Sequence, residues 1–306
     1  MRISNTEKGI FAWIDTRPMK RLILFSILTV CLALAGQGSY AQDTEAHRHT
    51  FIHQGMERSY LYYEPDTLLA QRPLIIVLHG YGGKAERNPA FITAAALEAG
   101  YAVCLPQGAA DGRGKTCWNV GYDFQQGLET DDVDFICSLA RHLAKEHRLN
   151  RSNIFVVGMS NGGEMCYLLA YKRPDFFAAF VPVAGLTMKW MKDVLVPRRP
   201  VSLMEVHGTA DRTSLWDGDP DNVGGWGPYI AVPDAMQTWA DAAGCTGELI
   251  TPFNSIVTLH RYTGGRRGAE VLLYEVAGGI HDWSTNQMDT PSEILAFCSR
   301  HFRSRR

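Results

Sequence analysis

The sequence lacks an excess of charge of either sign. Its 30 basic and 32 acidic residues leave a formal net charge of -2, so no whole-molecule field favours nucleic acid or an anionic membrane. It also lacks a phosphate-binding loop, a dinucleotide fingerprint, a CxxC pair and a metal-binding triad. These absences predict chemistry that uses no cofactor and no metal, and argue against zinc or thioredoxin-type sites.

The sequence has no apolar run of the length that usually spans a membrane. Residues 22–35 are apolar, but they fall short of the ~20 residues that a span needs. They follow a basic Met-Lys-Arg and precede a Ser-Tyr-Ala triplet of the kind found at cleavage sites. This pattern predicts a signal peptide over residues 1–41, with Met19 as an alternative start. The mature chain is then secreted or periplasmic without stable membrane insertion; a retained anchor is the alternative.

Cysteines are few and widely spaced in the predicted mature chain. Cys137 and Cys166 lie on the apolar faces of predicted helices, which favours burial as small hydrophobic side chains. The other four lie near the ends of predicted elements, where a disulfide could form in an oxidising compartment. These are Cys104, Cys117, Cys245 and Cys298.

Repeats, low-complexity blocks and long linkers are absent from residues 42–306, which predicts a single domain. Residues 73–78 (PLIIVL) are apolar throughout, as is typical of a strand buried on both faces of a parallel sheet. Such runs alternate with helical patterns and predict an α/β fold, with a mainly parallel sheet covered by helices on both faces. The predicted strands are residues 58–63 (an edge strand), 73–78, 101–105, 154–157, 179–183, 201–206, 257–262 and 271–276, and the predicted helices are 90–98, 131–145, 162–171, 232–242 and 291–301.

Ser160 lies between Gly158 and Gly162, where an apolar run gives way to a helical pattern. In a G-x-S-x-G sequence between strand and helix, the tight turn strains the serine backbone and leaves room only for small neighbours. The hydroxyl is then exposed at the helix N-terminus, where backbone N–H groups favour developing negative charge. This context predicts a nucleophilic Ser160, and a simple turn between strand and helix is the alternative.

A nucleophilic serine needs a histidine base that a carboxylate orients. In folds with this turn the chain order is serine, then acid, then histidine, so only histidines after Ser160 qualify. His281 follows the predicted strand 271–276 in the motif GGIHDW, where the base belongs. The others are interpreted as structural or solvent-facing: His207, His260 and His301.

The predicted acid is Asp211, which follows the strand 201–206 in the motif VHGTAD. It would emerge at the carboxyl edge of the sheet, on the side where the serine lies. Asp217 and Asp282 are alternatives: the first lies further into an aromatic, glycine-rich loop, and the second is the neighbour of the base. His207 is expected to hydrogen bond this loop from the strand end.

The loop HGYGG at residues 79–83 follows the strand 73–78 and predicts half of an oxyanion hole. Its first candidate donor is the backbone N–H of Tyr81, with Gly82 second. The other donor is the N–H of Asn161, the residue after the nucleophile. Loss of one such donor costs on the order of 2.7–4 kcal/mol of transition-state stabilisation.

Five motifs together resemble a known group of secreted esterases: LHGYGG, TCWNVGYD, GMSNGGEM, VHGTAD and GGIHDW. This group contains polyhydroxybutyrate depolymerases and the feruloyl and acetylxylan esterases of carbohydrate esterase family 1. The resemblance covers about residues 50–302. It implies an α/β-hydrolase fold and two-step acyl transfer by Ser160, Asp211 and His281. Relatives often carry a cysteine where this chain has Gly264-Gly265-Arg266, which puts a bridge from Cys245 in doubt.

Three tryptophans in glycine-rich loops are candidates for substrate binding: Trp118, Trp226 and Trp283. Their rings suit stacking on a sugar or a phenolic acyl group, and core packing is the alternative. The predicted partner is an ester-bearing polysaccharide or oligosaccharide such as feruloylated or acetylated xylan. Two other functions stay open, a polyhydroxybutyrate depolymerase and a non-catalytic carbohydrate-binding protein.

Overall fold

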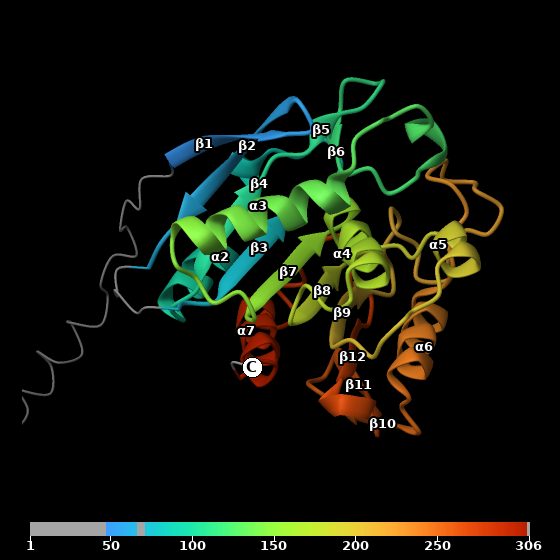
Figure 1. Ribbon diagram of the computed structural model, residues 1–306. Helices are drawn as coiled ribbons and strands as arrows, with labels where there is room; N and C mark the ends of the chain where they lie inside the picture. The colour runs from blue at the N-terminus through green and yellow to red at the C-terminus, as the bar shows by residue number, and fades with distance from the viewer. Residues whose placement is uncertain (1–46, 66–70, 305–306) are drawn as a thin grey trace, which may run out of the picture. The chain divides into compact units, whose positions relative to one another are not determined.

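The strands form one main sheet in the computed structural model, which describes residues 47–65 and 71–304 (Figure 1). Its order is β1-β2-β4-β3-β7-β8-β9-β12-β11-β10, and the six strands from β4 to β12 in this order are parallel. The strands are β1 (His47–His53), β2 (Met56–Tyr63), β3 (Leu74–Leu78), β4 (Ala102–Pro106), β7 (Ile154–Met159), β8 (Ala179–Val183), β9 (Leu203–Gly208), β10 (Gly247–Pro252), β11 (Val257–Thr263) and β12 (Val271–Val276), with a separate ladder of β5 (Ala109–Ala110) and β6 (Thr116–Cys117). The predicted signal peptide, residues 1–41, lies outside the described residues.

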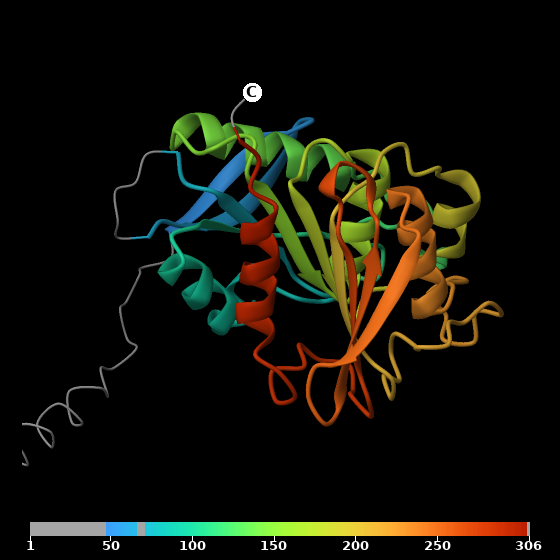
Figure 2. The same cartoon turned by 90° about the horizontal axis from the view of Figure 1, so that it is seen from below.

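Helices cover both faces of this sheet, which explains why β3, β4, β8 and β9 are buried along their whole length. Two of them, α2 (Ala90–Glu98) and α7 (Thr290–Arg300), pack on one face and lie side by side (Figure 2). The opposite face packs against α3 (Asp132–Glu146), α4 (Asn161–Lys172) and α6 (Val232–Ala243). The remaining short helices are α5 (Lys189–Val194), η1 (Ala85–Arg87), η2 (Asp123–Gln125) and η3 (Arg266–Gly268). The predicted α/β architecture is confirmed.

Helix α3 shows how the local sequence produces these elements. The side chain of Asp131 accepts a hydrogen bond from the backbone N–H of Asp134 at 2.9 Å and so caps the helix N-terminus. Its apolar positions recur at helical spacing and are buried, among them Val133, Ile136 and Leu143. The helix therefore begins where the sequence predicts, with its apolar stripe facing the sheet.

One strand prediction is wrong in its placement. Residues 58–63 belong to β2, but β2 is not an edge strand, because β1 pairs with it in an antiparallel hairpin. Gln54 and Gly55 form the turn with φ of 51° and 78°, the pair of left-handed residues that tight hairpins favour. Strand β1 begins with four consecutive polar residues, His47–Thr50, so its sequence lacks the apolar pattern by which a strand is predicted. At the other end of the sheet, the edge strand β10 was also not predicted.

The described residues contain no disulfide bond. All six cysteines there are free thiols, and five of them are buried while Cys245 is half-buried. Cys104 and Cys298 lie near the ends of β4 and α7, as predicted, but both are buried and neither is bridged. Burial also raises the pKa of the Cys117 thiol to about 11, which favours the unreactive protonated form.

Across residues 47–65 and 71–304, the helices are too short or too polar to cross a membrane.

Candidate active site

Ser160 lies at the junction of β7 and α4 in a conformation that side-chain-bearing residues avoid, with φ of 56° and ψ of -126°. The two flanking glycines are sterically required. A Cβ on Gly158 would lie 2.3 Å from the carbonyl oxygen of Gly162, and a Cβ on Gly162 would lie 2.4 Å from that of Leu78. The N–H of Ser160 donates to Val183 of β8 at 2.8 Å. The turn thus holds the serine at the N-terminus of α4, with its hydroxyl not used as a helix cap.

Asp211 and His281 form a hydrogen-bonded pair, with Oδ2 and Nδ1 2.7 Å apart. The other carboxylate oxygen of Asp211 accepts the backbone N–H groups of Thr213 and Ser214 at 2.7 and 2.8 Å. Burial opposes ionisation, but the bonds to His281 and to these N–H groups outweigh it and lower the pKa of Asp211. Since an ionised Asp211 only accepts, Nδ1 of His281 carries the proton. Nε2 of a neutral His281 is then unprotonated, as a general base requires.

The alternative acids and bases lie elsewhere. Asp217 is exposed, and Asp282 accepts the backbone N–H of Ser284 at 2.7 Å. His260 is bonded to two glutamates on the β10–β12 edge, and His301 lies beside Ser202 and Glu270. The structure therefore brings Asp211, rather than either rival, to His281.

Parallel strands bring Ser160, Asp211 and His281 to one edge of the sheet. They follow β7, β9 and β12, whose carboxyl ends meet at the same edge (Figure 1). Adjacent strands are about 4.8 Å apart, and the order β7-β8-β9-β12 spans three such steps. Among the described residues no direct hydrogen bond joins the Ser160 hydroxyl to His281. Catalytic hydrogen bonds are often long without substrate and tighten when it binds.

The loop of residues 79–83 lies directly against Ser160. A Cβ on Gly80 would be 3.3 Å from that of Ser160. The N–H of Gly82 donates to Thr116 at 2.7 Å, so this second candidate for the oxyanion hole is already engaged. The N–H groups of Tyr81 and Asn161 form no backbone hydrogen bond within the part of the chain that the structure describes. This difference favours Tyr81 over Gly82.

A buried histidine holds this loop in shape. His79 accepts the N–H of Gly108 through Nε2 at 2.9 Å, and its Nδ1 lies 2.8 Å from the carbonyl oxygen of Gly80. A ring that accepts at Nε2 and donates at Nδ1 is neutral. Burial is the largest influence on its pKa and lowers it, in agreement with this tautomer.

Asn161 and Glu164 tie the start of α4 to a neighbouring loop, a role that the sequence analysis missed. The Asn161 amide accepts the N–H of Trp118 at 2.7 Å and donates to its carbonyl oxygen at 3.2 Å. Glu164 accepts hydrogen bonds from Tyr122 and Asn161. Burial raises the pKa of Glu164 to about 7. Two sequence features could have indicated this contact: the glutamate in the first turn of the predicted helix and the tyrosine of the motif TCWNVGYD.

Trp118 does not lie where a substrate could reach it, so its predicted substrate-binding role is corrected. The side chain is fully buried. Its indole N–H donates to the carbonyl oxygen of His79 at 2.8 Å, and its ring packs on the His79 ring with centroids 4.9 Å apart. Trp118 therefore supports the loop of residues 79–83 from below.

Trp226 lies in a cluster of aromatic rings that includes Tyr81, the residue after Gly80 in the loop against Ser160. Its centroid is 5.5 Å from Tyr81, 5.2 Å from Tyr122 and 5.8 Å from Phe124. We call these four residues the aromatic cluster. By contrast, Trp283 is 8% exposed and packs edge-on against Phe91, which leaves little of its ring for a ligand.

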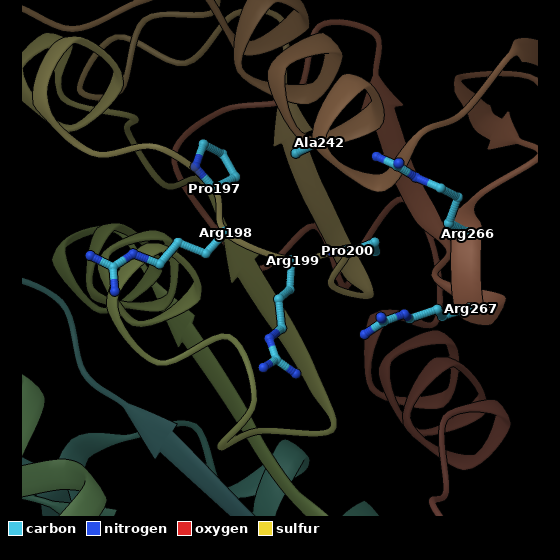
Figure 3. Close-up of a pocket in the computed structure, with 7 residues that line it drawn as sticks. All are labelled: Pro197, Arg198, Arg199, Pro200, Ala242, Arg266 and Arg267. Carbon is cyan, nitrogen blue, oxygen red and sulfur yellow. The ribbon is translucent and has the colours of Figure 1, made fainter.

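A pocket of about 450 Å³ lies away from these residues, before the amino ends of β9 and β12 (Figure 3). Arg199 pairs with Asp175 at 3.0 Å. The Arg266 side chain lies against Gly244 at the C-terminus of α6, where a cation is favoured. In Figure 3, the side chain of Arg198 points away from Arg266 and Arg267. The pocket is separate from the candidate active site, and it is lined by Pro197, Arg198, Arg199, Pro200, Ala242, Arg266 and Arg267.

The parallel strand order and the placement of Ser160, Asp211 and His281 after β7, β9 and β12 define an α/β-hydrolase fold. Two solved structures share this fold. An acetyl xylan esterase from Aspergillus awamori aligns with a TM-score of 0.56 and 14% identity, over 80% of this chain and 99% of that one. An S-formylglutathione hydrolase from Agrobacterium tumefaciens aligns with a TM-score of 0.51 and 12% identity, over 86% and 98%.

The family described as "Esterase PHB depolymerase" matches residues 58–219, more than half of the chain. The chain belongs to this family of carboxylic-ester hydrolases. A Nocardia uniformis protein named as an esterase, NocK, is 28% identical over 232 residues, covering 69% of this chain and 65% of its own length. Feruloyl esterase B of Piromyces equi is 28% identical over 217 residues, covering 68% and 39%. The chain thus spans less than two thirds of these relatives.

Proposed function

We propose that this protein is a secreted serine carboxylic-ester hydrolase that removes feruloyl or acetyl groups from a plant cell-wall polysaccharide such as xylan. The observation that carries the proposal is the bond between Asp211 and His281 at the edge where Ser160 occupies its strained turn. In acyl transfer, Ser160 is then the nucleophile, His281 the base and Asp211 the acid that orients the base.

The reaction has two steps that mirror each other. Nε2 of His281 takes the hydroxyl proton as Ser160 Oγ attacks the ester carbonyl carbon, and the imidazolium is stabilised by Asp211. The N–H groups of Tyr81 and Asn161 donate to the oxygen that becomes negative. His281 then protonates the departing alcohol, leaving an acyl group on Ser160. Water attacks this acyl-enzyme, His281 takes its proton and returns one to Ser160, and the acid is released.

Aromatic rings packed on Tyr81, in the loop that lies against Ser160, support the proposed substrate class. Three rings of the aromatic cluster, Tyr81, Phe124 and Trp226, are half-buried and suit stacking on a phenolic acyl group or a sugar, whereas Tyr122 is buried. Two relatives are named for such substrates, feruloyl esterase B of Piromyces equi and a bifunctional acetylxylan esterase/xylanase of Neocallimastix patriciarum. The family description favours a second candidate, hydrolysis of polyhydroxybutyrate.

Ser160→Ala tests the nucleophile. The variant should fold normally and lose at least about 10³-fold in kcat for p-nitrophenyl acetate, because no other group can form the acyl intermediate. It should also lose labelling by a fluorophosphonate. Ser299→Ala, at an exposed position in α7, is the matched control and should keep wild-type turnover. Near-normal turnover in Ser160→Ala would reject the assignment, and an unlabelled wild-type protein would favour the non-catalytic carbohydrate-binding alternative.

A substrate panel separates the two ester substrates. The purified protein is incubated with feruloylated xylan, acetylated xylan and amorphous polyhydroxybutyrate, and the released acids are measured. Release of ferulate or acetate at rates well above that of hydroxybutyrate supports the first proposal. The reverse order would assign the protein as a polyester depolymerase.

The proposal of export depends on residues 1–41. N-terminal sequencing of the protein recovered from periplasm and medium should give Gln42 as the first residue. Recovery of the uncleaved chain in a membrane fraction would favour the retained anchor.

A further inference from the structure

A buried row of polar side chains lies behind Asp211 and takes no part in the reaction described above. Strand β9 carries Glu205 and His207, two residues apart and therefore on the same face of the sheet. Both are fully buried. Nδ1 of His207 lies 2.9 Å from Oε1 of Glu205, and Nε2 lies 2.8 Å from the carbonyl oxygen of Ser214.

These contacts determine where the protons are. A carbonyl oxygen only accepts, so Nε2 of His207 must donate to Ser214. Glu205 already accepts the N–H of Gly185 at 3.1 Å and the hydroxyl of Tyr167 at 3.0 Å, which favours its ionised form. His207 therefore donates from both nitrogens, as an imidazolium paired with a buried carboxylate.

The charge balance agrees with this protonation. Burial, the largest influence, would lower the pKa of His207, but the bond to Glu205 and its charge outweigh burial, and the net pKa is raised. Burial likewise raises the pKa of Glu205, and His207 is the main group opposing it. Glu205 thus favours the charged form of His207, and His207 opposes the effect of burial on Glu205.

His207 contacts the acid in two ways. Its Nε2 lies 3.7 Å from Oδ2 of Asp211, the same oxygen that is bonded to His281. It also holds Ser214, whose N–H donates to the other oxygen of Asp211. One ring therefore acts on both oxygens of the carboxylate, on one by charge and on the other through the backbone.

We infer that Glu205 and His207 are positioning residues, a buried ion pair that keeps a cation behind Asp211 and thereby limits the proton affinity of His281. This inference rests on the proposed function. A fixed positive charge favours the Asp211 carboxylate and disfavours a second cation on His281.

Other titratable groups face this pair from the surrounding elements. From α4 these are Tyr167, bonded to Glu205, together with Cys166 and Glu164, which sense the charge of Glu205. On β12, Glu275 is the register neighbour of His207 but is bonded to His260. None of them supplies a positive charge, so the His207 ring, 3.7 Å from Asp211, is the member of this group that places a positive charge beside the acid.

Glu205→Gln is the decisive variant. It keeps the side-chain size but removes the charge that retains the second proton on His207, so burial returns His207 to the neutral form. The acid limb of the kcat/KM profile should move to higher pH by about one unit. Glu248→Gln, which removes a carboxylate partner of His260 on the edge hairpin, is the matched control and should leave the profile unchanged.

A second measurement keeps the inference testable if this variant does not fold. In the wild-type protein, NMR of ¹⁵N-labelled histidine should show one ring still protonated on both nitrogens at pH 8, and His207→Gln should remove that signal. An unmoved acid limb in folded Glu205→Gln, or a neutral His207 at pH 6, overturns the inference. If Ser160→Ala and wild type are equally inactive, the proposed function fails, while the NMR signal still reports on the ion pair.

Discussion

At the scale of single residues, three of the non-glycine residues with positive φ lie at the proposed nucleophile or follow strand β8 and His281. Ser160, Ala184 and Ser284 have φ values of 56°, 48° and 55°, a region that side-chain-bearing residues occupy at a cost of about 1–3 kcal/mol. Ser160 ends β7, Ala184 follows the neighbouring strand β8, and Ser284 lies three residues after His281. Ser160 is the one of these three that is both strained and placed at a helix N-terminus, where the proposed chemistry takes place.

Asp211→Asn should lower kcat by about 10³- to 10⁴-fold, because an amide can force the wrong tautomer on His281. The fold should persist, since asparagine can still accept the two backbone N–H groups of residues 213 and 214. Steady-state kinetics with p-nitrophenyl acetate measures the loss. Asp217→Asn is the control at an exposed position and should be near wild type. A larger loss in Asp217→Asn would show that the acid is misassigned.

Some residues of the candidate site could be predicted from the sequence and others could not. Ser160, Asp211 and His281 could be found because each stands in a short motif directly after a strand, and parallel strands bring such positions together. The burial of Trp118 could not be predicted, because the sequence of a glycine-rich loop is the same whether its tryptophan faces solvent or packs against a neighbouring loop. Glu164 and Tyr122 escaped notice because their partnership depends on the packing of a loop against α4, which no periodicity encodes.

At the scale of elements, the strand-turn-helix unit of β7 and α4 is held against the end of β3. The start of α4 approaches the carbonyl oxygen of Leu78 so closely that only glycine fits at position 162. The apolar runs of β3, β7, β8 and β12 were predictable for the same reason that they pack here, burial on both faces. The polar edge strands β1 and β10 were not, because partial exposure removes the pattern.

Gly162→Ala should destabilise the protein by about 1–3 kcal/mol, because the added methyl group overlaps backbone that cannot rotate away. Urea unfolding followed by circular dichroism gives the free energy of unfolding. Gly112→Ala is the control, since a Cβ there meets no atom within 4 Å, and its effect should stay within about 0.5 kcal/mol. Equal midpoints for the two variants would contradict the packing argument.

At the scale of the whole molecule, the two ends of the parallel strands differ in kind. The carboxyl ends carry the strained turn, the acid-base pair and the aromatic cluster, whereas the amino ends of β9 and β12 lie near the arginine-lined pocket (Figures 1 and 3). Both margins of the sheet are antiparallel hairpins, β1–β2 and β10–β11. A parallel core between such margins makes the carboxyl edge the natural position for the site.

Glu164 should make the stability of the whole molecule depend on pH. Its folded-state pKa of about 7 exceeds its ordinary value of 4.5, so between these values the folded state binds more protons than the unfolded state. The free energy of unfolding should therefore fall as pH rises from about 4.5 to about 7, by up to about 3 kcal/mol from this group. Urea unfolding at several pH values measures the slope. Glu164→Gln should remove this component, and an unchanged slope in the variant would contradict the assignment.

The aromatic cluster has a consequence for how this scaffold can vary. Tyr122, Phe124 and Trp226 come from segments that carry none of Ser160, Asp211 and His281. A change of loop there can alter which acyl group or polymer is accepted while the proton-transfer machinery stays intact. We expect the loop of residues 219–227 to be the better place to change substrate preference, because residues 119–125 also hold the start of α4 through the bond from Tyr122 to Glu164.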